Sequence, residues 1–418
     1  MTRLNRLKRI SLTTWIFIGL GSGILAGRLV GEPIVPAAQF LSDIFLRMLR
    51  MAIMPLILTS ITSGVVSIGS DKGVGRLGLK TLLYYLSSTL LAILTGQLLV
   101  NLLKPGVGAT VGLTADVESV PVSDDSIADL LLRIIPVNPF EALANGDVLP
   151  VIFFCIMFGI FVMHLQEPHK GKLVSAIEAA FKTMMNMTRF IVWLAPIGVF
   201  GINAMIAATT GLAAFKSLGF YFITVLLALF WHMGVDLPLL LRLIGRVNPL
   251  MHYKGMTSAM ITAFSTSSSM VTLPLNIECV TKRSRVSQKI ANFTLPIGAT
   301  VNMDGTALYE CVAAIFIAQI YGIELTALQQ FLVVLTALLA SIGAAAVPMA
   351  GLVMMSIILK AIGLPLEAVG IILAVDRILD MFRTTVNVTS DSCGAVIIAR
   401  SEGEALDRMG EPAEPGVD

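Results

Sequence analysis

Apolar stretches of roughly 20 residues recur along this chain, and each is long enough to cross the hydrocarbon core of a bilayer as a helix. They follow one another from Ser11 to Val396. Charged residues make up 13% of the 418 residues, whereas soluble domains contain about 25%. A soluble fold around one core is therefore excluded, and the sequence predicts an all-α protein that crosses the lipid bilayer many times. The net charge of +2 does not point to a nucleic-acid partner.

The cysteines lie singly in the sequence, without the paired spacing of a disulfide framework or a zinc site. We therefore expect free, buried thiols. The cysteines are Cys155, Cys279, Cys311 and Cys393.

The N-terminus carries a basic cluster ahead of an apolar run from Ile10 to Val30. A secretory signal peptide begins in the same way. This run, however, is long enough to span a membrane and carries glycines at spacings typical of helix packing, which favours a retained first span. The glycines are Gly19, Gly21, Gly23 and Gly27.

Basic residues tend to stay on the cytoplasmic side of a membrane, so their positions predict the course of the chain. Basic clusters follow alternate spans, and segment 105–127, with four acidic residues and no Lys or Arg, fits an external loop. This course predicts both termini in the cytoplasm. The predicted crossings lie near 12–31, 38–68, 78–103, 128–165, 183–211, 216–243, 286–320 and 362–399.

Two segments break the alternation. Segment 250–283 is basic at both ends and has a polar centre at 265–269, which predicts a re-entrant hairpin entering from the inside. An ordinary loop between spans is the alternative. Segment 327–361 is interrupted at 341–348 and lacks a basic cluster at its start, which predicts a second hairpin, from the outside. Inverted repeats with broken helices are the architecture of secondary transporters.

Polar residues in the last predicted span are spaced 4, 3, 4 and 4 apart, which places them within an arc of about 80° on a helix. Each ionised Asp or Arg at mid-membrane costs about 2.5–3.5 kcal/mol on insertion scales. A functional stripe is therefore favoured over a structural ion-pair ladder between helices, and Arg377 is expected to pair locally. The stripe consists of Asp376, Asp380, Arg383, Asn387 and Asp391.

A second polar group lies in the span before the outer hairpin. Asn302, Asp304 and Thr306 offer oxygen ligands, and we expect Gly305 to let the backbone leave the helix there. Ligation by oxygen alone suits a hard cation, and dispersed carboxylates favour the monovalent Na⁺. A bound cation would make the burial of Asp304 tolerable.

The charges constrain the cargo. Four aspartates in the two polar groups sum to −4 and two arginines to +2, which leaves −2 and calls for cationic cargo. Arg383 nevertheless suits a carboxylate. An acidic amino acid, L-aspartate or L-glutamate, would place its side-chain carboxylate on Arg383 and its ammonium on Asp380. Its α-carboxylate would meet Asn387 and backbone donors at Ser268 and Ser269, and Na⁺ would enter with it.

These residues resemble the glutamate transporter homologue family, the dicarboxylate/amino acid:cation symporters. The resemblance covers nearly the whole chain and rests on four segments, at 267–269, 302–306, 341–345 and 380–391. It implies eight transmembrane helices with two re-entrant helical hairpins as gates. It also implies a homotrimer in which a transport domain moves as an elevator along a scaffold.

The resemblance implies a division of the chain. Residues 1–75 and 105–212 would form the scaffold, the second part with the trimer contacts. Residues 76–104 and 213–402 would form the transport domain. The tail, 403–418, is expected to be disordered in the cytoplasm.

Ligand sets also follow from the resemblance. Further substrate contacts would be Thr306, Val347, Gly351 and Thr384. The implied sodium sites are formed by Asn387 and Asp391 with backbone near Gly298 and Asn302, by Asp304, Asn302, Tyr85, Ser88 and Thr89, and by backbone around Thr300, Ser341, Ile342 and Ala344.

Departures within the family bear on coupling. Asp391 favours sodium, because proton-coupled bacterial relatives carry Asn at that position. Glu310 matches the glutamate linked to proton transport in animal members, and is a candidate proton site. Met381 and Ser267 stand where animal and archaeal members carry an arginine, so the resemblance does not extend to potassium counter-transport.

Three alternatives remain open from the sequence. The cargo could be a C4-dicarboxylate, or glutamate carried with protons. An intramembrane aspartyl protease could use Asp304 and Asp380, although neither follows Gly-x-Gly. An ion channel is the third. We expect a transporter, not an enzyme, that crosses the cell (inner) membrane many times.

Overall fold

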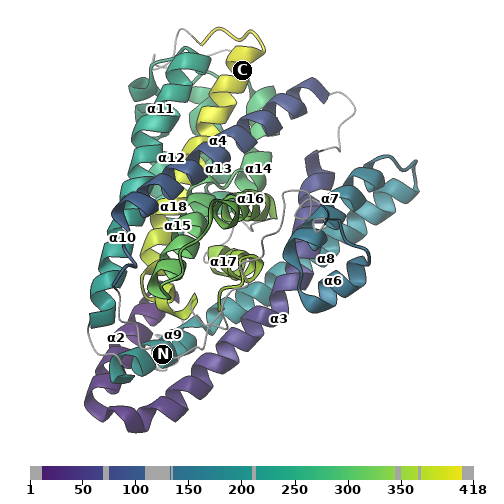
Figure 1. Cartoon of the computed structure of the whole chain (residues 1–418). Helices are drawn as coiled ribbons and strands as arrows, with labels where there is room; N and C mark the ends of the chain where they lie inside the picture. The colour runs from purple at the N-terminus through teal and green to yellow at the C-terminus, as the bar shows by residue number, and fades with distance from the viewer. Residues whose placement is uncertain are drawn as a thin grey trace, which may run out of the picture.

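The computed structural model describes residues 12–68, 75–108, 132, 135–209, 213–343, 350–365 and 369–406, and every regular element in these ranges is a helix (Figure 1). The α-helices are α2 (Leu12–Val30), α3 (Val35–Ile68), α4 (Gly75–Leu103), α6 (Pro139–Asn145), α7 (Val148–Met163), α8 (His169–Trp193), α9 (Ala195–Thr209), α10 (Ala213–Trp231), α11 (Leu237–Leu240), α12 (Pro249–Thr266), α13 (Ser269–Lys282), α14 (Gln288–Val301), α15 (Asp304–Ile320), α16 (Ala327–Gly343), α17 (Ala350–Ala361) and α18 (Val369–Ser401). A 3₁₀ turn, η1 (Glu32–Ile34), and two π-helical segments, η2 (His232–Asp236) and η3 (Leu241–Gly245), join them.

Three stretches in the described ranges are long and apolar enough to cross a membrane, namely Arg76–Leu103, Ser217–Gly245 and Gln288–Ile320. Five shorter apolar helices accompany them, among them parts of α2, α7 and α9. The all-α expectation is confirmed, whereas the predicted number of eight crossings stays a prediction.

The predicted span near 183–211 differs from the structure. Two helices occupy this region, because α8 ends at Trp193 and α9 begins at Ala195 after a turn at Leu194. Pro196 lies in the first turn of α9, where a missing N–H is tolerated. α8 starts at His169 and carries several charged residues, so it does not extend the apolar run of α9.

Both segments predicted as hairpins contain two helices. α12 and α13 are joined by a tight turn in which Ser267 takes a left-handed conformation, with φ of 50°. Ser268 then caps α13, since its Oγ accepts a hydrogen bond from the N–H of Val271. α16 and α17 form the second pair. Residues between them, including the predicted ligands Ala344 and Val347, lie outside the described residues.

Figure 1 shows α4 lying across a bundle of α10 to α18, with α2, α3 and α6 to α9 beside it. α4 packs on α15, α10 and α16, although it follows α3 in the chain, and α2 packs on α9. The division into a scaffold and a transport domain, and movement between them, stay predictions.

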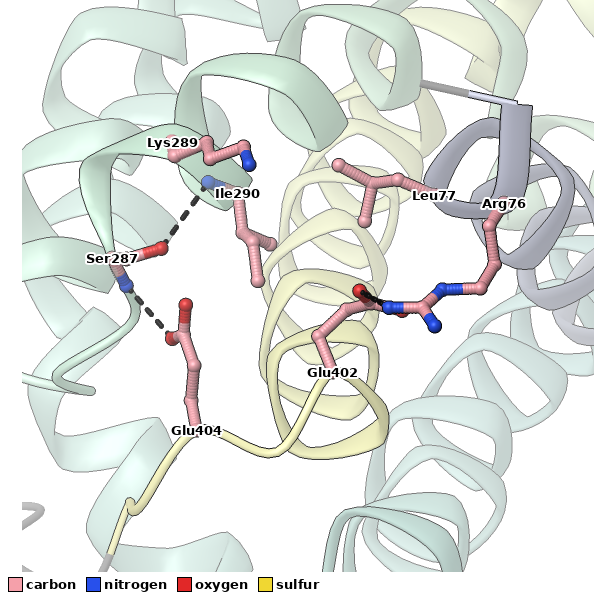
Figure 2. A pocket seen from close by; sticks show the side chains of 7 residues that line it. All are labelled: Arg76, Leu77, Ser287, Lys289, Ile290, Glu402 and Glu404. Carbon is pink, nitrogen blue, oxygen red and sulfur yellow. Dashed lines mark hydrogen bonds and ion pairs between the residues drawn. The ribbon is translucent and has the colours of Figure 1, made fainter. Parts of the chain in front are cut away.

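Ion pairs at one end of the bundle hold α4 against the end of α18. Glu402 contacts both Arg76 and Lys80 at 2.6 Å, and their hydrogen bonds keep the pKa of Glu402 below its usual value. Figure 2 shows Arg76 and Glu402 on one side of a cavity of about 430 Å³. On its other side, Glu404 accepts a hydrogen bond from the backbone N–H of Ser287, just before α14, at 3.0 Å. α4, α14 and the end of α18 are thus tied together at this end.

Glycines form the seam between α2 and α9. A Cβ on Gly23 would lie 2.5 Å from the carbonyl oxygen of Phe200, and Gly19 and Gly27 approach α9 backbone carbonyls equally closely. Such close approach of helix backbones is what small residues permit in membrane proteins. Gly21 does not belong to the seam, because no described atom of another helix lies within 4 Å of a Cβ placed there.

We predict that Gly23→Ala destabilises the protein whereas Gly21→Ala does not. Alanine raises helix propensity by about 0.8–1.0 kcal/mol at either position, but at Gly23 overpacking against backbone costs about 1–3 kcal/mol. The midpoint of thermal unfolding in detergent measures the difference. Equal shifts of the unfolding midpoint in the two variants would contradict the close packing of Gly23 against α9.

Candidate cation and substrate site

The break between α14 and α15 creates the centre of the site. Asn302 (φ −97°, ψ 88°) and Met303 (φ −116°, ψ 56°) leave the helical conformation, and α15 starts at Asp304. The expectation that Gly305 releases the backbone is wrong, because Gly305 lies inside the first turn of α15. Its missing side chain instead allows α18 to approach, since a Cβ there would lie 2.7 Å from the carbonyl oxygen of Arg383.

The Asp304 carboxylate is fully buried and receives hydroxyl donors from two helices. Thr89 Oγ1 donates to its Oδ1 at 2.7 Å, and Ser88 Oγ donates to its Oδ2. Ser390 Oγ of α18 donates to the same Oδ2 at 2.5 Å. The structure therefore brings the predicted residues Ser88 and Thr89 to Asp304, and adds Ser390, which the sequence did not single out.

His232 is a second residue that sequence reasoning missed. Its Nε2 lies 3.1 Å from Asp304 Oδ2, and its Nδ1 lies 2.9 Å from Asp236 Oδ2, which also accepts from Thr95 Oγ1 at 2.8 Å. A neutral imidazole donates from one nitrogen only, so contacts with two carboxylates require one more proton on the ring or on a carboxyl group. The signal that was available is the pair His232 and Asp236, one helical turn apart inside an apolar stretch.

This contact corrects the expectation that a bound cation alone makes buried Asp304 tolerable. His232, Ser88, Thr89 and Ser390 already satisfy the carboxylate. The π-helical segment η2 places His232 and Asp236, in agreement with the frequent occurrence of π-bulges at functional sites.

Asn302 links Asp304 and its surroundings to Asp391. Its Nδ2 donates to Asp391 Oδ1 at 2.9 Å and lies 3.1 Å from Ser390 Oγ, while its Oδ1 lies 3.5 Å from Thr89 Oγ1. The backbone of α14 approaches Asp391 at Gly298, as described below. The two predicted side-chain sodium sites are therefore neighbours that share Asn302.

The hydroxyl of Tyr85 lies close to the Asp391 carboxylate. Its hydroxyl donates to the carbonyl oxygen of Thr294 at 2.8 Å. A Cβ on Gly298 would lie 2.6 Å from both Tyr85 Oη and Asp391 Oδ1. Glycine at this position therefore lets the backbone of α14 come close to the carboxylate.

Arg383, which precedes Asp391 on α18, forms a buried group of ion pairs. Its Nη2 contacts Asp380 Oδ1 at 2.8 Å and Asp376 Oδ1 at 3.1 Å, and Arg377 Nη1 contacts Asp380 Oδ2 at 3.2 Å. Asp380, the predicted partner of a substrate ammonium, is thus already paired with two arginines. The local pairing expected of Arg377 is present, with Asp380 as partner.

Arg383 keeps two donors, Nε and Nη1, without a hydrogen-bond partner among the described residues. The guanidinium carbon lies 3.9 Å from the centre of the Tyr309 ring, a cation–π contact. A Cβ on Gly351 of α17 would lie 2.7 Å from Nη1. The second hairpin thus meets the arginine at a glycine, and the role of Gly351 as a substrate contact stays a prediction.

Asn387 joins α18 to the start of α15. Its Oδ1 accepts from the N–H of Gly305 at 2.8 Å, and its Nδ2 donates to Thr306 Oγ1 at 3.1 Å. Thr384 is buried one turn before it.

The remaining predicted ligands are less closely tied to these groups. The hydroxyls of Thr300 and Ser341 donate to carbonyls of their own helices, at 3.0 and 2.8 Å. Ser268 and Ser269 are buried at the tip of the α12–α13 pair. Ile342 lies in the last turn of α16. Their proposed roles depend on backbone groups and remain predictions.

Helices broken within an apolar bundle, with buried acids, an arginine and hydroxyls at the breaks, define an ion-coupled secondary transporter. Residues 12–401 match the family model of the sodium:dicarboxylate symporter family, and the chain belongs to that family. It is therefore a membrane-embedded symporter and not an enzyme, which excludes the protease and channel alternatives.

Curated relatives support this assignment over nearly their whole length. Excitatory amino acid transporter 3 of Oryctolagus cuniculus is 34% identical, with 98% of this chain and 90% of the relative covered. A proton/sodium-glutamate symport protein of Bacillus caldotenax is 35% identical, with 97% and 98% covered. Its counterpart in Bacillus subtilis is 36% identical, with 95% and 94% covered.

We predict that Gly298→Ala weakens activation by sodium. The new methyl group would force Asp391 and Tyr85 away from the α14 backbone, so we expect the Na⁺ concentration for half-maximal uptake to rise about tenfold, equivalent to ~1.4 kcal/mol. Uptake of labelled dicarboxylic amino acid by proteoliposomes at graded Na⁺ measures this. Gly219→Ala is the control, because a Cβ there meets no described atom within 4 Å. Unchanged Na⁺ dependence in Gly298→Ala would argue against a cation beside Asp391.

Proposed function

We propose that this symporter couples inward movement of Na⁺ to uptake of an acidic amino acid, L-aspartate or L-glutamate. The observation that carries the proposal is the polar face of α18. Arg383 on this face has donors without partners in the described structure, and Asp391, farther along the same helix, lies in one oxygen cluster with Asp304 of α15. We further propose an elevator movement within a homotrimer in the cell membrane, with both termini in the cytoplasm. The names of the relatives, which include glutamate, sodium and proton, support the proposed substrate class and coupling ion.

Arg383 would bind the side-chain carboxylate of the substrate. Two of its N–H donors lack partners in the described structure, and an unsatisfied buried donor costs about 1–3 kcal/mol. A carboxylate would satisfy them with charge-assisted hydrogen bonds. The substrate ammonium would share Asp380 with the two arginines that already contact it.

The same ion pairs keep a C4-dicarboxylate as the second candidate. A substrate without an ammonium group would leave Asp380 paired as it is here, with Arg377 and Arg383. Binding of such a substrate would therefore not leave Asp380 as an unpaired buried charge.

Sodium would bind at the two neighbouring acids. Asp304, Asn302, Ser88 and Thr89 offer only oxygen ligands, and Asp391 shares Asn302 with them. Hard oxygen ligands with a single carboxylate at each point suit a monovalent cation better than Ca²⁺ or Mg²⁺. Tyr85, whose hydroxyl lies near Asp391, is proposed as a further ligand of the Asp304 ion.

The proposal predicts Na⁺-driven accumulation that depends on Arg383. In proteoliposomes, the wild type should accumulate labelled aspartate against its gradient only when Na⁺ is directed inward. Arg383→Cys should reduce this uptake at least a hundredfold, because the variant removes the only guanidinium proposed to bind the substrate carboxylate, and such charged contacts are worth ~2–5 kcal/mol.

Arg242→Cys, at an exposed arginine, is the matched control and should transport normally. Succinate competing as strongly as aspartate would favour the C4-dicarboxylate candidate. Aspartate accumulation without sodium, or an unchanged aspartate affinity in Arg383→Cys, would contradict the proposal.

Glu310 is proposed to carry a proton with the substrate. Its carboxyl group is fully buried, and neither oxygen has a hydrogen-bond partner among the described residues. An ionised carboxylate without partners is costly in such a place, so the group is neutral in this conformation. It lies next in sequence to Tyr309, which packs on Arg383.

We therefore predict that Glu310→Gln keeps Na⁺-driven uptake but no longer moves protons. A pH-sensitive dye inside proteoliposomes should report acidification during aspartate uptake by the wild type and none by the variant. Glu278→Gln, at an exposed glutamate paired with Lys282, controls for loss of a carboxyl group. Acidification that persists in Glu310→Gln would place the proton elsewhere.

A further inference from the structure

Ser390 lies at the point where the two proposed sodium sites meet. Its Oγ is 2.5 Å from Asp304 Oδ2, 3.1 Å from Ser88 Oγ and 3.1 Å from Asn302 Nδ2. The residue is fully buried, and its carbonyl oxygen accepts a hydrogen bond from Tyr84 Oη at 3.3 Å. The side chain is thus fixed with its hydroxyl between a carboxylate and a carboxamide.

The position of Ser390 on α18 explains why it reaches this point. It follows Asn387 by three residues, so it extends the polar face that contacts the start of α15. It precedes Asp391, whose Oδ1 accepts from the same Asn302 amide. Three hydroxyls from α4 and α18 therefore converge on Asp304. Two of them, those of Thr89 and Ser390, also contact Asn302, which belongs to both sites.

We propose that Ser390 Oγ is an oxygen ligand of the sodium ion bound at Asp304. The inference rests on the proposed sodium coupling and adds a ligand to it. A hydroxyl can donate to a carboxylate and can also turn a lone pair toward a cation, because its hydrogen rotates. On ion binding, the O–H of Ser390 turns away from Asp304 and keeps its hydrogen. Its oxygen then completes a set of ligands with one carboxylate, hydroxyls and the Asn302 carbonyl.

A purely structural hydroxyl would act differently from a ligand. If Ser390 only satisfied Asp304, its removal would lower stability equally at every sodium concentration. If it binds sodium, its removal weakens binding to the folded state, and the stabilisation that sodium provides is reduced, since that term grows as RT ln(1 + [L]/Kd). The dependence of thermal unfolding on sodium therefore separates the two roles.

The test measures the unfolding midpoint of the purified full chain, without substrate, as NaCl replaces choline chloride at constant ionic strength. We expect the wild type to be stabilised progressively by Na⁺. Ser390→Ala should need about tenfold more Na⁺ for the same increase. Thr389→Val is the matched control, because Thr389 is buried next to Ser390 but donates only to the Thr385 carbonyl of its own helix. It should follow the wild-type curve.

Ser390→Cys provides a second variant of nearly the same size, with a sulfur that hard cations bind poorly, and its curve should also shift to higher Na⁺. If Ser390→Ala does not fold, the Na⁺ dependence of Ser390→Cys tests the role of Ser390. A wild-type Na⁺ dependence in either folded variant would overturn the role of Ser390. A wild type that gains no stability from Na⁺ would instead contradict the proposed sodium coupling.

Discussion

Burial of charged side chains inside an apolar helical bundle is the constraint on which the rest of the structure depends. Asp304, Asp376, Asp391 and Arg383 are all almost inaccessible to solvent, and each would cost several kcal/mol without partners. Three devices compensate for this burial. Ion pairs surround Arg383, hydroxyls and His232 surround Asp304, and a carboxamide contacts Asp391. These compensations are local, so each charged group brings its own set of neighbours into a fixed position.

Interruptions in the helices bring these neighbours together. The break at Asn302 turns the chain so that Asp304 starts a new helix, and the π-helical segment η2 positions His232 behind it. Glycine then shortens the distances between helices, since Gly298 and Gly305 let α14 and α15 approach α18. An unbroken bundle with larger residues at these points would hold the same polar groups too far apart to share one ligand.

The sequence predicted the elements with a strong period or composition, and it predicted less where the outcome depended on tertiary contact. The helical hairpins, the polar stripe on α18 and the meeting of Ser88 and Thr89 with Asp304 follow from pattern or resemblance. His232 and Ser390 did not, because their partners lie on other helices, 72 and 86 residues away. The role predicted for Gly305 was wrong for the same reason. Position 305 requires glycine because the backbone of another helix, α18, lies close to it. The turn at Leu194 divided a predicted span, because apolar composition does not mark where a helix ends.

The hydrogen bonds around Asp304 also bear on how a sodium ion would bind and leave. Each donor that now contacts the carboxylate would have to turn away or share it when a cation arrives. Binding therefore exchanges internal hydrogen bonds for ion coordination, and the net gain is smaller than the attraction between a bare carboxylate and a cation. His232 adds to this effect, because a proton between Asp236 and Asp304 offsets part of their charge. A symporter has to release its ions on the far side, and a carboxylate that regains internal hydrogen bonds when the ion leaves lowers the free-energy cost of that release.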